Sequence, residues 1–150
     1  MNPAQPKPRQ AARISWILYD WASSPLPTLH ATFVFAVYFT TVIAPENGSF
    51  YWAQMTALSA FLLAFAAPIM GRYADSEGLV KQGFIVSSVI AAAVTAALWF
   101  IQPSSDFIQL ALILSGLSIF FSEAAFLLYN GLLPLIGSKS EYGRLSGLGW

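Results

Sequence analysis

Four long apolar segments limit what this chain can fold into. The second and third, residues 52–70 and 83–101, contain no charged residue. The first, residues 14–44, is interrupted by Asp20, Pro25 and Pro27, and the fourth, residues 107–133, contains Glu123. An α-helix needs about 20 apolar residues to cross the ~30 Å hydrocarbon core of a bilayer. The pattern therefore predicts an all-α integral membrane protein with four transmembrane helices, and the lipid bilayer is its expected surroundings.

The composition excludes several other classes of protein. Charged residues make up 9% of the sequence and hydrophobic residues 57%, whereas a soluble domain has roughly 25% charged residues. The net charge is zero, so no nucleic-acid partner is expected. The chain has no cysteine and one histidine, His30, and no nucleotide-binding or hydrolase motif. We therefore expect no enzyme, no cofactor and no metal site.

The segments set an expected domain layout. Residues 1–13 form a polar cytoplasmic tail, and residues 14–150 form a partial N-terminal transmembrane bundle. The spans are expected at about 16–43, 52–70, 83–101 and 107–130, and the first is bent near Pro25 and Pro27 because proline disrupts a helix. A fifth helix starts near residue 145, with Gly143 and Gly147 spaced for close helix packing. Because a helix entering a bilayer must satisfy its carbonyl groups, we expect the chain to continue beyond Trp150.

The basic residues lie on one side of these spans. Three precede the first span, two follow the second and two follow the fourth: Lys7, Arg9, Arg13, Arg72, Lys81, Lys139 and Arg144. The connections on the other side carry the acids Glu46 and Asp106. Cytoplasmic loops of membrane proteins are enriched in lysine and arginine. This asymmetry predicts a cytoplasmic N-terminus in a bacterial inner (plasma) membrane.

The connection between the second and third spans has a distinctive pattern. It contains Gly71, Arg72, Asp75, Gly78 and Lys81, and its glycines suit a tight reversal of the chain. One interpretation is a polar turn whose charges simply stay in water. The other is a cytoplasmic gating-loop motif.

Three stretches resemble known transporters. Gly71, Asp75, Gly78 and Lys81 resemble the motif between helices two and three of the major facilitator superfamily, although Ser76 stands where that motif has a basic residue. Residues 15–24, Ser-Trp-Ile-Leu-Tyr-Asp-Trp-Ala-Ser-Ser, resemble the Tyr-Asp-Trp-Ala-Asn-Ser signature of its vacuole-effluxer-like branch, which is related to autophagy protein twenty-two. Residues 130–134 and 143–150 resemble the same branch.

The resemblance implies a secondary active transporter that moves a small solute by alternating access. It implies amino-acid efflux as one expected activity, and a second helical half, missing from this chain, as a partner. Asp75 would then lie against a helix of that second half and help to latch the outward-facing state. Arg72 and Lys81 would belong to the same cytoplasmic charge cluster.

Four polar residues on the spans are candidates for transport or proton coupling: Glu123, Asp20, His30 and Asn130. A charge in hydrocarbon costs on the order of 3 kcal/mol, so it is expected to face a cavity or a partner. Helical spacing places Asp20 on one face of the first span with Ser24, Pro27 and Ala31, and Glu123 on one face of the fourth with Gly116 and Asn130. These polar faces predict the wall of a water-accessible cavity.

Plainer interpretations remain open for the same residues. Asp20 can lie at the headgroup level beside Trp16, Tyr19 and Trp21, which are interfacial anchors by residue type. His30 can be a hydrogen-bonded packing residue instead of a proton relay. For the whole chain, the alternatives are a stand-alone four-span scaffold or assembly protein, and an enzyme acting on lipid through the charges of the second connection.

Overall fold

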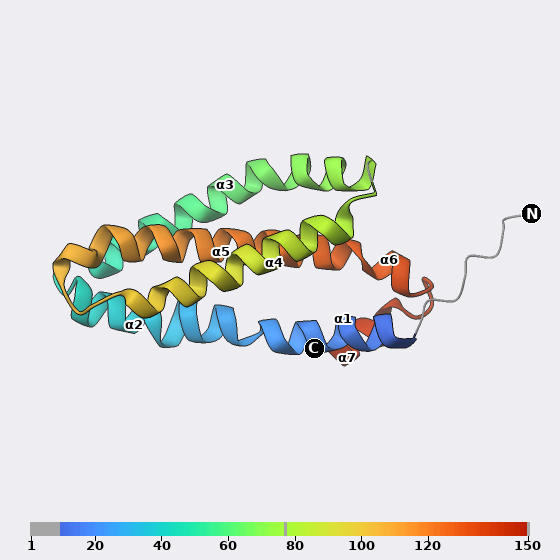
Figure 1. Cartoon of the computed structure of the whole chain (residues 1–150), viewed down its shortest axis with the longest axis horizontal. Coiled ribbons are helices and arrows are strands. Elements are labelled where there is room, and N and C mark those ends of the chain that lie inside the picture. Colours follow the sequence, from blue (N-terminus) through green and yellow to red (C-terminus); the bar gives the residue numbers. More distant parts are fainter. Residues whose placement is uncertain (1–9, 77, 150) are drawn as a thin grey trace, which may run out of the picture.

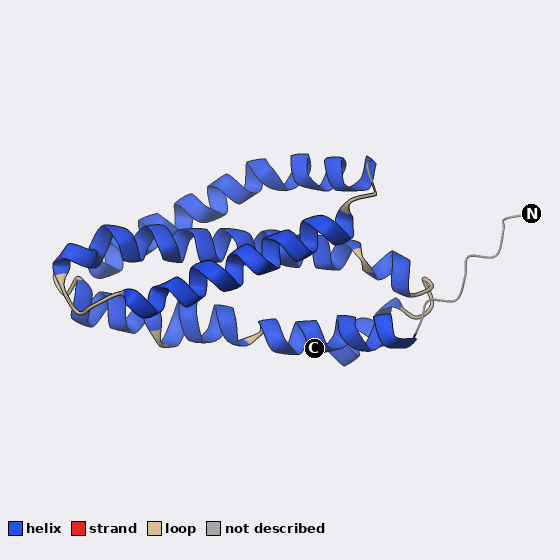
Figure 2. Cartoon of the chain, viewed as in Figure 1, coloured by secondary structure: helices blue, strands red, loops and turns tan. Residues whose placement is uncertain are grey.

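The computed structural model describes residues 10–76 and 78–149, except the side chain of Asp75. Long helices α3 (Gly48–Ser76), α4 (Val80–Ala97) and α5 (Ile108–Gly131) run side by side with a segmented first span (Figure 1). Short 3₁₀ turns, η3 (Leu98–Phe100) and η4 (Ser105–Phe107), lie between α4 and α5, and α6 (Leu133–Ile136) and α7 (Tyr142–Gly149) follow α5. The described residues contain only helices and short links (Figure 2).

Four helical stretches are long and apolar enough to cross a membrane: Gln10–Ile43, Gly48–Ala74, Val80–Phe100 and Ser105–Ile136. Each is longer than the span expected from hydropathy, because the helices continue into the polar residues on either side. The prediction of an all-α integral membrane protein with four transmembrane helices and the start of a fifth is confirmed. Residues 1–9 of the expected tail at 1–13, with Lys7 and Arg9, lie outside the described residues, as does Trp150, and α1 begins within the remaining part, at Gln10.

The first span departs from a regular α-helix at its prolines. Helix α1 (Gln10–Ser23) ends just before Pro25, and a π-helical segment, η1 (Leu26–Phe33), takes over. Proline has no N–H to donate and crowds the preceding turn, so the usual i→i−4 register cannot continue through residues 25–27. The Val34 N–H donates instead to the Leu29 carbonyl at 2.8 Å, five residues back. A short helix α2 (Phe35–Tyr38) and a second π-helical segment, η2 (Phe39–Ile43), complete the span.

Helix α5 is the central helix of the bundle, and its small residues let three neighbours approach. The Ser115 hydroxyl lies 3.2 Å from His30 Nε2 of η1, and the Ser118 hydroxyl lies 2.7 Å from the Thr95 hydroxyl of α4. On α3, the Ser59 hydroxyl donates to the Gly116 carbonyl at 3.2 Å. Helices in lipid associate through close packing of small residues and interhelical hydrogen bonds, since lipid removes the hydrophobic drive between them. These contacts therefore hold the bundle together.

Large apolar side chains cover the outside of the bundle. Phe61, Phe65 and Ile69 on α3, Val89 on α4 and Ile113 on α5 are all more than half exposed. In water an apolar surface of this extent would drive aggregation, whereas in a bilayer it contacts lipid tails.

The connection between α3 and α4 is shorter than the sequence suggests. Residues 71–82 were expected to form a loop, but α3 continues through Gly71, Arg72 and Asp75 to Ser76, and α4 begins at Val80. The reversal is a glycine-terminated helix end: Gly78 has a φ of +66°, and the Leu79 N–H donates to the Ala74 carbonyl at 2.8 Å. The loop predicted from the sequence was therefore too long, whereas the prediction of a glycine at the chain reversal is confirmed.

Helix α7 starts at Tyr142, close to the position expected for a fifth helix, and packs against α1. Gly143 and Gly147 do not make the close contact expected of their spacing, because a Cβ atom at either would meet nothing within 4 Å. The close approach is made by Gly149, where a Cβ would lie 2.9 Å from Asp20 Oδ2 and 3.3 Å from Trp16. Gly143 and Gly147 lie on the side of α7 that no other described residue covers, so close packing at this pair stays a prediction.

Replacing Gly78 by alanine is expected to destabilise the protein by about 1–2 kcal/mol, because an L-residue is strained in the left-handed backbone region. Gly147→Ala is the matched control: it lies in a helix with open space around it and should be neutral or stabilising by roughly 0.5–1 kcal/mol. Thermal unfolding in detergent of the full-length protein containing this chain measures both. Equal melting temperatures for the two variants would contradict the turn described here.

Candidate functional site

A cavity of about 900 Å³ lies between the first span and helices α4, α5 and α7. This cavity, called the central cavity below, is within the size range of small-molecule sites. Its charged, aromatic and hydroxyl side chains come from Tyr19, Asp20, Ser23, Ser24, Thr28 and His30 of the first span, Ser88 and Thr95 of α4, and Ser122, Glu123 and Phe126 of α5. Small alanines fill much of the remaining wall, and Gly149 of α7 forms part of its edge.

The polar face expected on the first span lies on this wall. Asp20, Ser24, Pro27 and Ala31 all line the central cavity. At the end of α1 the Asp20 carbonyl accepts the regular i→i−4 bond from the Ser24 N–H at 3.1 Å and a second bond from the Ser24 hydroxyl at 2.8 Å. Pro25 and Pro27 cannot donate to carbonyls of the preceding turn, so acceptor groups are left for other donors at this position.

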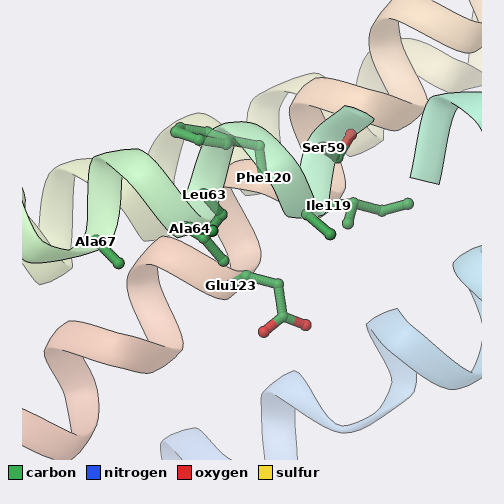
Figure 3. A pocket seen from close by; sticks show the side chains of 8 residues that line it. Ser59, Leu63, Ala64, Ala67, Ile119, Phe120 and Glu123 are labelled. Atoms are coloured by element: carbon green, nitrogen blue, oxygen red, sulfur yellow. The ribbon is translucent and has the colours of Figure 1, made fainter. Parts of the chain in front are cut away.

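Asp20 and Glu123 face the same cavity from opposite helices. Asp20 is half-buried on α1 and Glu123 is exposed on α5. Within the described part of the chain, neither carboxylate has a hydrogen-bond or ion-pair partner. Figure 3 shows the Glu123 carboxylate pointing away from the α3 side chains Leu63 and Ala64, which line a smaller cavity of about 410 Å³. Glu123 therefore lies where the two cavities meet.

His30 is the deepest of the candidates, at 6% exposure. Its Nε2 lies 3.2 Å from the Ser115 hydroxyl, and its ring lies against the rings of Phe35 and Trp52. These contacts agree with a packing residue. However, His30 also lines the central cavity, and its Nδ1 has no partner among the described residues.

Asn130 lies apart from this group. Its side chain is exposed and donates to the Phe126 carbonyl of its own helix at 2.9 Å. Gly116 packs against Ser59 and Met55 of α3. Each step of seven residues advances about 10 Å along α5, so Gly116, Glu123 and Asn130 lie at three different depths and meet different neighbours.

An aromatic pair that was not predicted from the sequence joins α1 to α5 near one end of the bundle. This end carries Arg13, Arg72 and Lys81 and is called the basic end below. Trp16 stacks on Tyr129 with ring centroids 4.3 Å apart. The Trp16 indole N–H donates to the Tyr129 carbonyl at 3.2 Å, and the Tyr129 hydroxyl donates to the Trp16 carbonyl at 3.1 Å. Trp16 and Tyr129 are both buried within the protein, whereas the neighbouring Trp21 is largely exposed. Residue type alone cannot distinguish an anchor from a buried partner.

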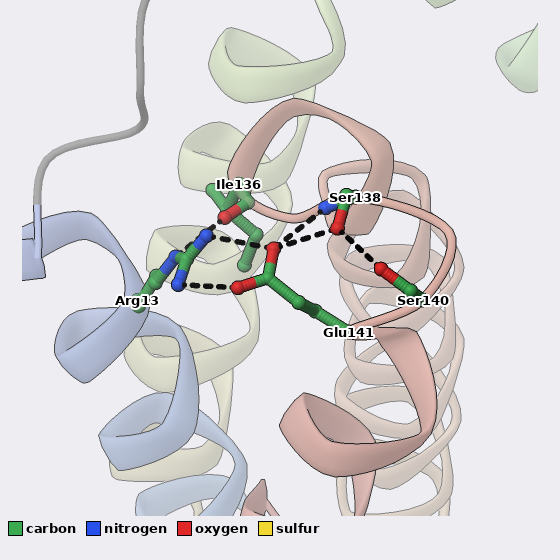
Figure 4. A network of polar contacts seen from close by, with 5 residues as sticks. All are labelled: Arg13, Ile136, Ser138, Ser140 and Glu141. Carbon is green, nitrogen blue, oxygen red and sulfur yellow. Dashed lines mark hydrogen bonds and ion pairs between the residues drawn. The ribbon is translucent and has the colours of Figure 1, made fainter.

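A second contact, an ion pair with hydrogen bonds between α1 and the α6–α7 connection, was also not predicted from the sequence (Figure 4). Arg13 forms a two-pronged ion pair with Glu141 at 3.0 Å and donates to the Ile136 carbonyl at 2.9 Å. The Ser138 N–H and hydroxyl donate to the same Glu141 carboxylate at 3.0 and 2.8 Å. These donors from Ser138, followed by Arg13, lower the pKa of Glu141 from 4.5 to about 2.

The residues of the expected gating motif gather at this basic end. Arg72 in the last turns of α3 and Lys81 in the first turn of α4 are exposed, and Gly78 forms the turn between them. Asp75 lies in the same last turns of α3, but its side chain lies outside the described part of the structure. Figure 1 shows that the start of α1, this turn and the α6–α7 connection share one end of the bundle, whereas the connections with Glu46 and Asp106 share the other.

Comparison with known proteins gives one informative match. Over 143 residues, the sequence is 34% identical to YxiO of Bacillus subtilis (strain 168), an uncharacterized MFS-type transporter. The chain is similar to a transporter. The match covers 91% of this chain and 32% of YxiO, so the chain spans about a third of the length of this relative. It supports membership of the major facilitator superfamily and a general transport role. No protein-family model matches the sequence, and no solved structure is significantly similar to it.

Glu141→Gln is expected to destabilise the protein at neutral pH, because the amide cannot replace the ionised partner of Arg13. A carboxylate whose folded pKa is lowered contributes stability above pH 4.5, and this contribution is lost as the pH falls toward 2. The difference in melting temperature between wild type and variant should therefore shrink as the pH is lowered from 7 through 4.5 to 3.

Glu46→Gln is the matched control, since Glu46 is an exposed acid at the opposite end of the bundle. It should change stability little at any of these pH values. A difference for Glu141→Gln that stays constant across the whole series would show that its carboxylate is not held in the ionised form.

Proposed function

We propose that this chain forms part of a secondary active transporter of the major facilitator type, which moves a small solute by alternating access. The observation that carries the proposal is the central cavity, where two carboxylates without partners line a space between membrane-crossing helices. The similarity to an MFS-type transporter supports it. YxiO is about three times as long as the matched stretch, so the proposal includes a second helical half that closes the cavity from the other side.

Proton coupling through Glu123 and Asp20 belongs to this proposal. An ionised carboxylate next to hydrocarbon is costly unless a proton or a cation neutralises it. Asp20 and Glu123 lie on the wall of one cavity, and a proton taken up by either removes that cost. Such a group favours one conformation when protonated and another when ionised, which links proton movement to solute movement. His30 also lines this cavity, and its Nδ1 has no partner among the described residues, so it is a further candidate proton relay.

The orientation and the gate are also proposed. The described basic residues Arg13, Arg72, Lys81, Lys139 and Arg144 belong to segments at one end of the bundle, which favours that end as the cytoplasmic one. In this orientation the protein lies in a bacterial inner membrane with its N-terminus inside. The turn around Gly78 is then a cytoplasmic gate, where Asp75 meets the second half in the outward-facing state.

The branch and the solute come from the resemblance. The Tyr-Asp-Trp-Ala stretch at residues 19–22 supports a place in the vacuole-effluxer-like branch and amino-acid efflux as the activity. It places Asp20 within the part of α1 that lines the central cavity. The signature therefore has a physical reason at its aspartate, since this residue brings a carboxylate to the cavity.

Glu123→Gln tests the coupling. The full-length protein is reconstituted into proteoliposomes, and uptake of a mixture of ¹⁴C-labelled amino acids is measured with and without an imposed pH gradient. We expect the gradient to stimulate uptake by the wild type at least tenfold, and the variant to lose this stimulation while it still exchanges labelled for unlabelled solute. Glu46→Gln, the acid at the far end of the bundle, should behave like the wild type.

Unchanged pH dependence in Glu123→Gln would remove Glu123 from the coupling mechanism. A wild type that moves no solute under any gradient would favour the stand-alone scaffold instead of the transporter.

A further inference from the structure

Helix α7 lies against the part of α1 that carries Asp20. Gly149, in the last turn of α7, forms part of the edge of the central cavity, which Asp20 also lines. A Cβ atom at position 149 would lie 2.9 Å from Asp20 Oδ2 and 3.3 Å from Cζ3 of Trp16. Non-bonded heavy atoms pack best at about 3.5–4.0 Å, so a carbon atom at this position would force one of its neighbours to move.

Trp16 is not the neighbour that moves. Its side chain is buried, and its ring stacks on the ring of Tyr129 with the centroids 4.3 Å apart. The two residues also exchange two hydrogen bonds, at 3.2 and 3.1 Å. A shift of the Trp16 ring would disturb the stack and both hydrogen bonds in a closely packed interior.

Helix α7 is also held in place along its length. The ion pair in Figure 4 fixes the chain just before its first residue. Leu145, near its middle, is buried in an apolar cluster with Trp16. Near its end, the Leu148 carbonyl accepts a hydrogen bond from the Trp21 indole N–H at 3.2 Å. These three contacts keep the backbone of position 149 close to α1.

The carboxylate of Asp20 is therefore the group that gives way. It has no hydrogen-bond or ion-pair partner in the part of the chain that the structure describes. It is also the end of a side chain with two rotatable bonds, which can adopt another rotamer at little cost. A side chain at position 149 thus relocates the carboxylate and leaves the helices in place.

From these contacts we propose that Gly149 is a positioning residue for Asp20: because it has no side chain, the carboxylate lies back against α7 at the edge of the central cavity. This inference rests on the proposed transport function, in which Asp20 takes up and releases a proton at that place. A larger residue at position 149 turns the carboxylate away from α7 and into the cavity. Helix α7 thereby contributes space to the coupling site instead of a functional group.

Chemical labelling of the carboxylates tests their position directly. The purified full-length protein is treated in detergent at pH 6.5 with a water-soluble carbodiimide and glycinamide, and peptide mass spectrometry gives the labelling rates of Asp20 and Glu123. In Gly149→Ala we expect the rate at Asp20 to rise at least threefold, because its carboxylate turns into the cavity, and the rate at Glu123 to stay unchanged. Gly147→Ala is the matched control, since a Cβ there meets open space, and it should label like the wild type.

A second variant distinguishes a moved carboxylate from a loosened bundle. Trp21→Phe removes the N–H group that holds the Leu148 carbonyl, so the end of α7 can move outward and make room for the methyl group of Gly149→Ala. The double variant should lose at least half of the increase at Asp20. If the methyl group merely loosened the packing, the double variant would label faster than Gly149→Ala, and the proposal would be wrong.

Transport measurements show whether the position matters for coupling. In proteoliposomes, Gly149→Ala should keep solute exchange and lose at least half of the stimulation by a pH gradient. An unchanged labelling rate at Asp20, an equal rise at Glu123 or in Gly147→Ala, or full gradient stimulation in Gly149→Ala would overturn the assignment. Labelling needs no solute movement, so a wild type that carries no solute would remove the proposed function, while the labelling rates still decide whether Gly149 positions Asp20.

Discussion

The structure depends on one constraint, which is that polar groups inside a hydrocarbon layer must find partners within the protein. Helix α5 shows how this is met. Ser115, Ser118 and the Gly116 carbonyl each pair with a different neighbouring element, and the small side chains around them let the helices approach. At the basic end, Trp16 and Tyr129 exchange two hydrogen bonds while their rings stack. The helices are thus joined by polar contacts as well as by buried apolar side chains such as Phe39 and Ile43, while other large apolar side chains face outward.

Two groups depart from this rule, and the functional proposal follows from them. Asp20 and Glu123 have no partner in the described residues, although the hydroxyls around them are paired. They share the central cavity with His30, whose buried Nδ1 has no partner among the described residues. The proposal is that these carboxylates bind something from outside the described residues, whether a proton or a solute.

The transmembrane helices could be predicted from the sequence more completely than the contacts between them. Charge-free apolar runs and the ~30 Å width of the bilayer were enough to predict four transmembrane helices. Helical spacing on the first span placed Asp20, Ser24, Pro27 and Ala31 on one wall. On the fourth span the same spacing gave the right direction around the helix but not the depth: Asn130 lies about 10 Å further along α5 than Glu123, next to the end of the helix and away from the cavity.

Contacts between distant segments were beyond the reach of sequence patterns. Nothing local links Arg13 to Glu141 or Trp16 to Tyr129, because these pairs depend on which helix ends meet. The length of α3 was missed for a related reason: polar residues after Pro68 suggested a loop, yet a helix that has left the membrane can continue in water. Gly78 could be predicted because a chain reversal at that position needs a residue that tolerates a positive φ.

The central claim is that the cavity between α1, α4 and α5 opens alternately to the two sides of the membrane. Its most direct test uses the absence of cysteine from this stretch. Ser122→Cys on the cavity wall and Ser87→Cys in the packed face of α4 are introduced singly into the full-length protein, with other cysteines replaced. A membrane-impermeant thiol reagent is then applied from either side of oriented vesicles. The account predicts that Cys at position 122 reacts from both sides and Cys at position 87 from neither; labelling of position 122 from one side only, under every gradient and solute condition, would contradict it.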